Sequence, residues 1–305
     1  MQLGMIGLGR MGGNMAERLL RAGHEVIGTS RTRQTVDEAA ARGITPVYSI
    51  EDLMAALTPP RAVWVMVPAG EPTEAMLQQL AGLCAPGDIL IDGGNSYYKD
   101  SIRRGGQLQA QGFHFLDVGT SGGIWGLQEG YSLMVGGAAE PVTALRPIFE
   151  ALAPAPDKGW AHLGPVGAGH FTKMVHNGIE YGMMQAIAEG FAIMERRTEL
   201  QLDLHAVAET WRHGSVVRSW LLDLVADGLA EDTGLCDIAP YVPDSGEGRW
   251  TAAEAIELDV PAPIITLSLL QRLRSRDDHC FSDRVLAMMR HQFGGHEMRR
   301  EDGHE

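Results

Sequence analysis

Short apolar runs alternate with longer amphipathic stretches along the first half of the chain. The stretches between the runs, such as residues 13–22 and 71–83, have the length and the helix-forming residues of crossover helices. This alternation predicts βαβ units on a parallel sheet, which is an α/β fold. The predicted strands are rich in β-branched and aliphatic residues and cover residues 3–6, 25–29, 62–67, 89–92, 114–118 and 131–135.

The pattern changes near residue 163, where strand-like runs nearly disappear and long segments rich in Ala, Leu, Met and Glu begin. Residues 153–159 are typical of a loop before a last strand, and residues 164–169 are typical of a joint into a long helix. We therefore expect an α/β domain over residues 1–163 and an all-α domain over residues 164–305 that ends in a polar tail.

Size and charge narrow the class of protein. A chain of 305 residues is long enough for two hydrophobic cores. Its net charge of −14 argues against a general nucleic-acid-binding protein, although a few arginines can still bind an anionic small molecule. The three cysteines are widely spaced and lie outside any C-x-x-C motif, which fits a reducing compartment. No apolar run is long enough to cross a bilayer and no signal peptide precedes the first motif, so we expect a cytoplasmic protein.

The segment GLGRMG follows the first predicted strand and opens a predicted helix. It matches G-x-G-x-x-G in the context of a dinucleotide-binding turn, which predicts a Rossmann-type domain. Gly7 permits the tight turn, Gly9 lets the backbone approach a pyrophosphate, and Gly12 allows the helix to pack closely on the strand. Arg10 and Met11 lie between these glycines and complete the predicted cofactor loop.

Cofactor choice depends on the end of the second predicted strand, where a carboxylate would bind the ribose 2′-hydroxyl of NAD. The residues that follow this strand are Ser30, Arg31, Thr32 and Arg33, and none of them is acidic. Arginine and hydroxyl groups can instead bind a 2′-phosphate, so this segment favours NADP, with NAD still possible. Two solvated arginines on a loop are the alternative interpretation.

A polar stripe runs along the predicted helix over residues 167–184. Lys173, Asn177 and Glu180 share one face because they are spaced i, i+4 and i+7, and His176 and Tyr181 flank them. The other positions are mostly apolar, which predicts a largely buried helix. A solvated face with incidental Lys–Glu pairing is the alternative, but this mixture of groups is suited to acid–base chemistry. No histidine spacing here is typical of a metal site, so we expect no metal.

The run GAGHFTKMVHNGIEYGMMQ resembles the signature helix of the 6-phosphogluconate dehydrogenase family. The resemblance implies that Lys173 is the general base or acid, that Glu180 is the second acid, and that His176, Asn177 and Tyr181 bind substrate. Three earlier segments agree in order and spacing. Residues 92–96 resemble the loop whose Asn95 lies between nicotinamide and substrate, residues 119–123 resemble the substrate-carboxylate loop with Ser121, Gly122 and Gly123, and residues 67–70 resemble the loop whose Val67 and Pro68 flank the nicotinamide.

The family also holds its substrate phosphate with residues beyond this helix and with a tail from a neighbouring subunit. The resemblance implies this role for Arg249, Arg272, Arg290 and His296, and it implies a homodimer or homotetramer with a helical substrate and dimerisation domain. The chain departs from the longer members of the family in two ways, of which the first concerns the phosphate. Longer members have Lys and Thr where this chain has Ser245 and Glu247, for which Arg249 could compensate, and this chain resembles the shorter bacterial branch.

The implied reaction is the oxidative decarboxylation of 6-phospho-D-gluconate, a phosphorylated sugar acid, to D-ribulose 5-phosphate and CO2 in the pentose phosphate pathway. One alternative is a β-hydroxyacid dehydrogenase, such as 3-hydroxyisobutyrate dehydrogenase, which acts on a small unphosphorylated acid. Another is a protein that senses NADP without catalysis. Glu180, Arg272 and the tail residues Arg290 and His296 argue against the first alternative, and the pairing of Lys173 with Glu180 argues against the second.

Overall fold

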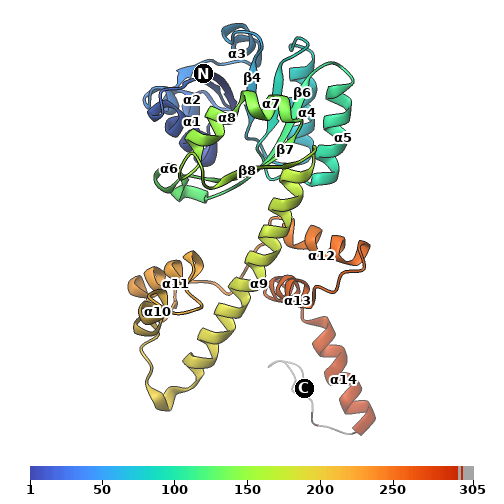
Figure 1. The fold of residues 1–305 in the computed structure, drawn as a ribbon. Helices are drawn as coiled ribbons and strands as arrows, with labels where there is room; N and C mark the ends of the chain where they lie inside the picture. Colours follow the sequence, from blue (N-terminus) through green and yellow to red (C-terminus); the bar gives the residue numbers. More distant parts are fainter. Residues whose placement is uncertain (295–296, 298–305) are drawn as a thin grey trace. The chain divides into compact units, whose positions relative to one another are not determined.

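A computed structural model describes residues 1–294 and 297 of the chain (Figure 1). The chain divides into two compact units, the first over Met1–Gly178 and the second from Ile179 onward. The assignment of residues 1–163 and 164–305 to separate domains follows secondary structure rather than contacts, and it stays a prediction. No helix in the described part of the chain is long and apolar enough to cross a membrane.

The first unit is built on one eight-stranded sheet. The strand order is β3-β2-β1-β4-β5-β6-β7-β8, and every neighbouring pair is parallel except β6 and β7. The order reverses between β1 and β4, which is the switch point where Rossmann-type sheets bind dinucleotides. The strands are β1 Gln2–Ile6, β2 Glu25–Thr29, β3 Thr45–Pro46, β4 Ala62–Val65, β5 Ile89–Asp92, β6 His114–Ser121, β7 Ser132–Gly137 and β8 Trp160–Gly164.

All six predicted strands are confirmed, and β8 confirms the expected last strand after residues 153–159. The two-residue strand β3 was not predicted, because it is too short to form an apolar run. The helices of this unit are α1 Arg10–Arg21, α2 Arg33–Ala40, α3 Ile50–Ala56, α4 Glu71–Ala81, α5 Tyr98–Gln109, α6 Gly126–Glu129, α7 Ala139–Ala144 and α8 Arg146–Leu152. The α/β fold class is therefore confirmed for this part of the chain.

Helices cover both faces of the sheet. Successive residues of a strand point to opposite faces, so each strand contributes side chains to two cores. In β4, Trp64 enters the core formed with α1, α2 and α8, whereas Val63 and Val65 enter the core formed with α3, α4 and α5. Strands that are buried on both faces read as continuous apolar runs, which is why they were recognisable in the sequence.

The long helix α9 covers Ala168–Arg196, so it begins in the first unit and continues into the second. The described part of the second unit is otherwise helical and contains no strand. Its helices are α10 Leu204–Arg212, α11 Trp220–Glu231, α12 Glu247–Glu257, α13 Pro263–Arg274 and α14 Phe281–Gly294. The predicted helical second half is thus confirmed.

One expectation about α9 holds only up to Gly178. The helix was expected to be largely buried, but beyond Gly178 several of its apolar side chains are exposed: Ile179 is 52% exposed, Met183 is 43% exposed and Ile193 is 72% exposed. The apolar period continues along the helix, while the described residues of this chain do not cover that part of its surface. Exposed apolar residues at this density are typical of surfaces that associate with another molecule.

Candidate active site

Four of the predicted binding segments follow neighbouring strands of the sheet. Gly7 follows β1, Val67 and Pro68 follow β4, Asn95 follows β5, and Ser121 ends β6. These strands are adjacent and mutually parallel, so their carboxyl ends meet at one edge of the sheet. The structure therefore brings together segments that are more than a hundred residues apart in the sequence.

The glycine loop after β1 fits a dinucleotide. Gly7 has a φ of 96°, and a Cβ atom there would collide with the carbonyl oxygen of Met66. Gly12 is buried, and a Cβ atom there would collide with the carbonyl oxygen of Gly7. By contrast, Gly9 is exposed, and a Cβ atom there would meet no atom within 4 Å. Gly9 is also the N-cap of α1 and supplies no side-chain cap, so the first N–H groups of this helix are open to an anion.

The two arginines after β2 differ in their surroundings. Arg33 lies over the ring of Tyr48, with 4.4 Å from its Cζ atom to the ring centroid, and its Nε is 3.8 Å from a carboxylate oxygen of Asp37. Arg31 is exposed and has no hydrogen-bond or ion-pair partner among the residues that the structure describes. Thr32 caps α2 by accepting a hydrogen bond from the N–H of Thr35 at 3.4 Å. The guanidinium of Arg31 is therefore better placed to bind a ligand than that of Arg33. Ser30, which precedes Arg31, is half-buried.

The first turn of α9 is held by a buried carboxylate on β6. Asp117 is fully buried, and its Oδ1 and Oδ2 atoms accept hydrogen bonds from the N–H groups of Gly167 and His170 at 2.7 and 2.8 Å. The Nδ1 atom of His170 is 2.7 Å from the hydroxyl of Ser101 on α5, and both side chains are buried. These contacts fix where α9 leaves the sheet.

This anchoring places Lys173 against β6. A Cβ atom on Gly119 would collide with the Cβ atom of Lys173, so the helix can approach the strand only because residue 119 is glycine. Gly119 is the first residue of the predicted substrate-carboxylate loop, which continues to Ser121, Gly122 and Gly123. The structure therefore brings the backbone of Lys173 next to the strand that carries this loop.

The polar stripe of α9 is half-buried at Lys173, His176 and Asn177, and the Nδ1 atom of His176 is 2.9 Å from the amide oxygen of Asn177. Glu180 follows in the same helix, seven residues after Lys173, and is also half-buried. A helix that carries a basic, an amide and an acidic group at these spacings can supply proton transfer.

In the second unit, Tyr181 gathers the predicted phosphate residues. Tyr181 is 4% exposed, and the Arg272 guanidinium lies over its ring with 3.5 Å between Cζ and the ring centroid. The phenol oxygen accepts a hydrogen bond from the N–H of Ser245 at 3.3 Å, and Arg272 donates to the carbonyl of Pro243 at 2.9 Å. Tyr181, Arg272 and the segment around residue 245 thus form one cluster.

Asp244 organises the arginines of that cluster. Arg249 donates two hydrogen bonds to its carboxylate at 2.9 and 3.1 Å, and Arg276 donates a third at 2.8 Å. These hydrogen bonds, those from Arg249 first, lower the pKa of Asp244 below its usual value. Sequence reasoning assigned no role to Asp244 or Arg276, since neither residue stands in a distinctive pattern. The carboxylate of Glu247, which is 2% exposed, accepts a hydrogen bond from the Ser245 hydroxyl at 2.6 Å.

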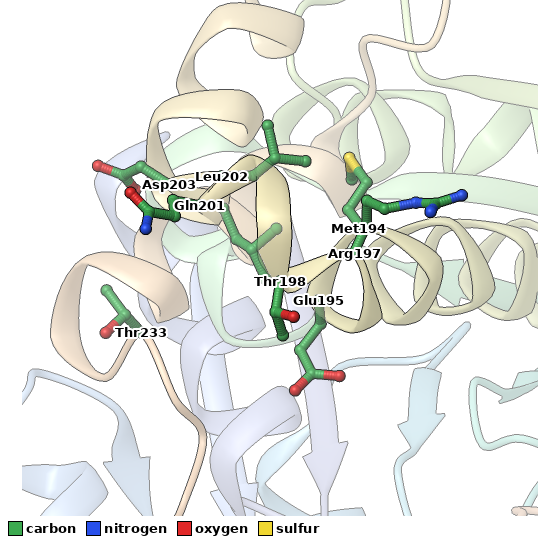
Figure 2. A pocket seen from close by; sticks show the side chains of 9 residues that line it. Met194, Glu195, Arg197, Thr198, Gln201, Leu202, Asp203 and Thr233 are labelled. Carbon is green, nitrogen blue, oxygen red and sulfur yellow. The ribbon is translucent and has the colours of Figure 1, made fainter.

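The predicted tail residues are only partly described. Arg290 is exposed on α14, whereas His296 lies outside the described residues. An open hollow near the end of α9 is lined by other residues, which Figure 2 shows, including Arg197, Gln201 and Thr233. None of the predicted site residues lines this hollow, so we assign it no part in the chemistry. The described residues contain no group of three or more His, Cys, Asp or Glu side chains arranged to hold a metal ion.

Almost the whole chain matches the models of known protein families. Residues 2–164 match the NAD binding domain of 6-phosphogluconate dehydrogenase, and residues 169–304 match the 6-phosphogluconate dehydrogenase C-terminal domain. The NAD(+)-dependent, decarboxylating 6-phosphogluconate dehydrogenase of Haloferax volcanii is 44% identical over 99% of this chain and 100% of its own length.

Two solved structures bear on the alternatives. The Plasmodium falciparum 6-phosphogluconate dehydrogenase, described with its cofactor NADP+ and its substrate 6-phosphogluconate, has a TM-score of 0.84 and 28% identity over 100% of this chain and 67% of that chain. The 3-hydroxyisobutyrate dehydrogenase of Mycobacterium tuberculosis has a TM-score of 0.72 and 22% identity over 91% of this chain and 94% of that chain, a likeness that shows a common fold only. On its sequence over both domains, the chain belongs to the 6-phosphogluconate dehydrogenase family.

Proposed function

We propose that this protein catalyses the oxidative decarboxylation of 6-phospho-D-gluconate to D-ribulose 5-phosphate and CO2, with reduction of a nicotinamide cofactor. The observation that carries the proposal is the likeness over the full length of both proteins to the decarboxylating enzyme of Haloferax volcanii. This reaction belongs to the pentose phosphate pathway, and we place the protein in the cytoplasm.

We assign the proton transfers to Lys173 and Glu180. Lys173 accepts the proton of the C3 hydroxyl of the sugar acid, while the bound cofactor supplies the hydride acceptor. The Lys173 ammonium then protonates the oxygen of the new C3 carbonyl as the β-keto acid loses CO2, which gives an enediol without a metal. Glu180 then gives a proton to C2 of the sugar acid, which becomes C1 of the product, while Lys173 takes the proton back from the oxygen on C3 and leaves the ketone. The packing of Lys173 on Gly119 supports this assignment, because it puts the base beside the strand that carries the substrate-carboxylate loop.

We assign substrate binding to the groups around this helix. Asn95, His176, Asn177 and the loop of Ser121, Gly122 and Gly123 bind the sugar acid, with Asn177 close to the chemistry. Tyr181, Arg249 and Arg272 bind the phosphate end. The clustering of Tyr181, Arg272 and residue 245 supports the second group, while Arg249 is already bound to Asp244 and must share its guanidinium.

For the cofactor we propose NADP as the preferred ligand. Its pyrophosphate binds at Gly7–Gly12 with Arg10 and Met11, its 2′-phosphate binds Ser30, Arg31 and Thr32, and its nicotinamide lies near Val67, Pro68 and Asn95. The exposed and unpaired guanidinium of Arg31 supports NADP. The Haloferax volcanii relative is named as NAD(+)-dependent, so kinetic tests of this protein need both cofactors.

We also propose a homodimer or homotetramer, in which Arg290 and His296 reach the phosphate site of a neighbouring subunit. The exposed apolar side chains of the second unit support self-association, since Ile193, Ile256 and Phe281 are each more than 70% exposed. Mixing an Arg290→Ala protein with a Lys173→Met protein tests the shared site, because subunit exchange should restore activity only if Arg290 acts across the interface.

The decisive experiment is a kinetic comparison at 340 nm of 6-phosphogluconate, gluconate and 3-hydroxyisobutyrate, each with NADP and with NAD, coupled to detection of CO2. We expect the largest kcat/KM for 6-phosphogluconate with stoichiometric CO2. Oxidation of 3-hydroxyisobutyrate alone, or cofactor binding with no turnover of any of the three acids, would replace the proposal with one of the two alternatives. Lys173→Met should abolish turnover and leave cofactor binding intact.

A further inference from the structure

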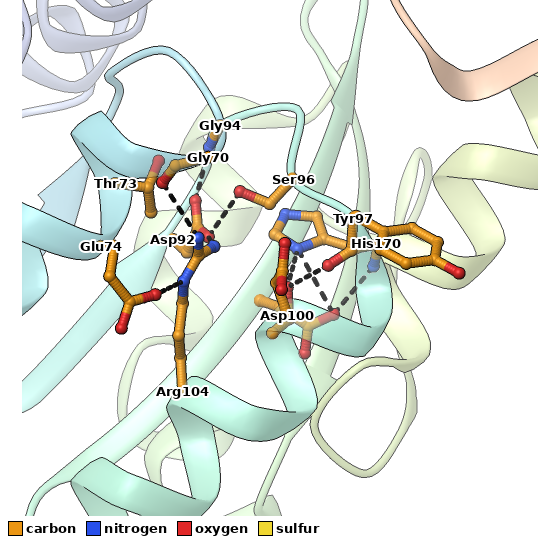
Figure 3. A network of polar contacts seen from close by, with 12 residues as sticks. Gly70, Thr73, Glu74, Asp92, Gly94, Ser96, Tyr97, Asp100, Arg104 and His170 are labelled. Atoms are coloured by element: carbon orange, nitrogen blue, oxygen red, sulfur yellow. Dashed lines mark hydrogen bonds and ion pairs between the residues drawn. The ribbon is translucent and has the colours of Figure 1, made fainter. Parts of the chain in front are cut away.

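A buried ionic network lies between two loops at the carboxyl edge of the sheet, and Figure 3 shows its side chains. Arg104, on α5, is 3% exposed, and Asp92, at the end of β5, is fully buried. Glu74, on α4, is 17% exposed at its side chain. Charged groups are rarely buried unless they are paired, so we expect a buried network of this kind to have a specific role in the structure.

The guanidinium of Arg104 points in three directions. Its Nε donates to a carboxylate oxygen of Glu74 at 2.8 Å, and its Nη2 donates to the carbonyl oxygen of Gly70 at 3.0 Å. Its Nη1 lies 3.6 Å from a carboxylate oxygen of Asp92. One planar group therefore contacts the loop after β4, the helix that follows this loop, and the end of β5.

Asp92 also binds residues of the loop after β5. Its Oδ1 accepts a hydrogen bond from the N–H of Gly94 at 3.1 Å, and its Oδ2 accepts one from the hydroxyl of Ser96 at 2.7 Å. Gly94 and Ser96 are the two neighbours of Asn95 in the sequence. The Asp92 carboxylate thus binds the backbone of one neighbour and the side chain of the other neighbour of Asn95, which is itself half-exposed.

The two loops also touch directly. A Cβ atom on Gly94 would lie 2.9 Å from the carbonyl oxygen of Val67, so the backbones have no room for a side chain between them. Beside this contact, the buried hydroxyl of Thr73 donates to the carbonyl oxygen of Pro68 at 2.9 Å. The carbonyls of Pro68 and Gly70 are therefore both bound by buried side chains.

We propose that Arg104 is a positioning residue, which holds the loop of Val67–Gly70 and the loop of Asp92–Ser96 at one spacing. This inference rests on the proposed function for the location of the nicotinamide, which lies between these loops. In this proposal Arg104 contacts neither the nicotinamide nor the sugar acid, and it acts through Gly70 and Asp92. A lysine would keep the positive charge, but its single ammonium group cannot reproduce the two directed hydrogen bonds to Glu74 and Gly70 while it also faces Asp92.

The test compares Arg104→Lys with Arg61→Lys as a matched control. Arg61 also pairs with a buried aspartate, since its Nη1 donates to Asp88 at 3.0 Å and its Nε donates to the carbonyl of Met54 at 3.0 Å. It precedes β4, at the opposite end of the strands from the proposed site. Both substitutions should lower the thermal midpoint, so stability alone does not distinguish them.

Two measurements do distinguish them. In Arg104→Lys we expect kcat to fall roughly tenfold to a hundredfold, because small misplacements of reacting groups cost this much. The fluorescence of bound NADPH, measured without substrate, should return toward that of free NADPH. The dissociation constant of NADPH should change less than about threefold, because the pyrophosphate end binds elsewhere. Arg61→Lys should leave kcat and the NADPH emission within about twofold of the wild type.

Equal losses of kcat in the two variants at equal losses of stability would overturn the proposal, as would a folded Arg104→Lys protein with wild-type kcat and NADPH emission. If Arg104→Lys does not fold, Ser96→Ala decides, because it frees only one side of Asn95. Its kcat should then fall while its cofactor affinity is kept, and unchanged kinetics would overturn the proposal. Failure of the wild type to oxidise 6-phosphogluconate would refute the proposed function, whereas the NADPH emission would still test the role of Arg104.

Discussion

Replacing Asp117 by asparagine should loosen the start of α9 and thereby misplace Lys173. The carboxylate accepts N–H groups from Gly167 and His170, whereas an asparagine amide has only one oxygen. One buried N–H group would then face the amide NH2 group instead of an acceptor. Losing a hydrogen bond to a buried charged group costs about 1.5–3 kcal/mol. The lost interaction of a negative charge with the helix N-terminus adds about 1 kcal/mol.

We therefore expect a loss of about 3 kcal/mol in the free energy of unfolding of the first unit. Since 1 kcal/mol corresponds to roughly 2–4 °C for a unit of this size, the thermal midpoint should fall by about 10 °C. Circular dichroism with thermal and urea unfolding measures this change. Turnover should fall as well, with cofactor affinity kept, because Lys173 lies within one turn of His170.

Asp88→Asn is the matched control for this experiment. Asp88 is 1% exposed and also accepts two backbone N–H groups, from Arg61 at 2.7 Å and from Ala85 at 2.9 Å, but it precedes β5 at the far end of the sheet. It should lose comparable stability and keep its kcat. An Asp117→Asn protein with wild-type stability, or a loss of kcat that Asp88→Asn reproduces, would refute the reasoning.

Two further predictions concern the cofactor and the pH. Arg31→Ala should lower kcat/KM for NADP by about 10-fold or more and leave kcat/KM for NAD nearly unchanged. Arg33→Ala should change both values little. Steady-state kinetics with both cofactors measures these effects, and equal effects of the two substitutions would contradict the role of Arg31. The pKa of Glu74 is lowered to about 2 by hydrogen bonds, from Arg103 first and from Arg104 as well. A folded pKa below the unfolded value stabilises the protein above pH 4.5, and this contribution is lost as the pH falls toward 2. Urea unfolding should therefore find Glu74→Gln less stable than the wild type at pH 6, with a gap that closes between pH 4.5 and 2.

The elements of the first unit were predictable because burial on both faces leaves a direct mark on the sequence. The run of residues 62–65 is apolar throughout, since Val63, Trp64 and Val65 all enter a core. The strand at Thr45–Pro46 leaves no such mark, because both of its residues are exposed. The exposure of Ile179 and Ile193 was missed for a related reason, since an apolar period in a sequence does not say what covers the face.

The candidate site was predictable as separate segments but not as a set of contacts. The stacking of Arg272 on Tyr181 joins residues that are far apart in the chain, and nothing in either neighbourhood indicates the partner. The same holds for Arg104, which is one of several charged residues on α5 and whose burial depends on the loops packed against it. Pairing of buried charges is a tertiary property, so a single sequence carries little information about it.

At this edge of the sheet, the residues proposed to react with substrate and the residues that position them are subject to different constraints. Lys173 is half-buried, and its type follows from the proton that we propose it carries. Its distance from the sheet, however, is set by Gly119, where any side chain would push the helix away, and its direction is set by the bonds of Asp117. Neither Gly119 nor Asp117 needs to meet a ligand to matter for turnover. Substitutions at such buried small and acidic positions should therefore impair turnover through geometry, while cofactor binding at the glycine loop after β1 stays intact.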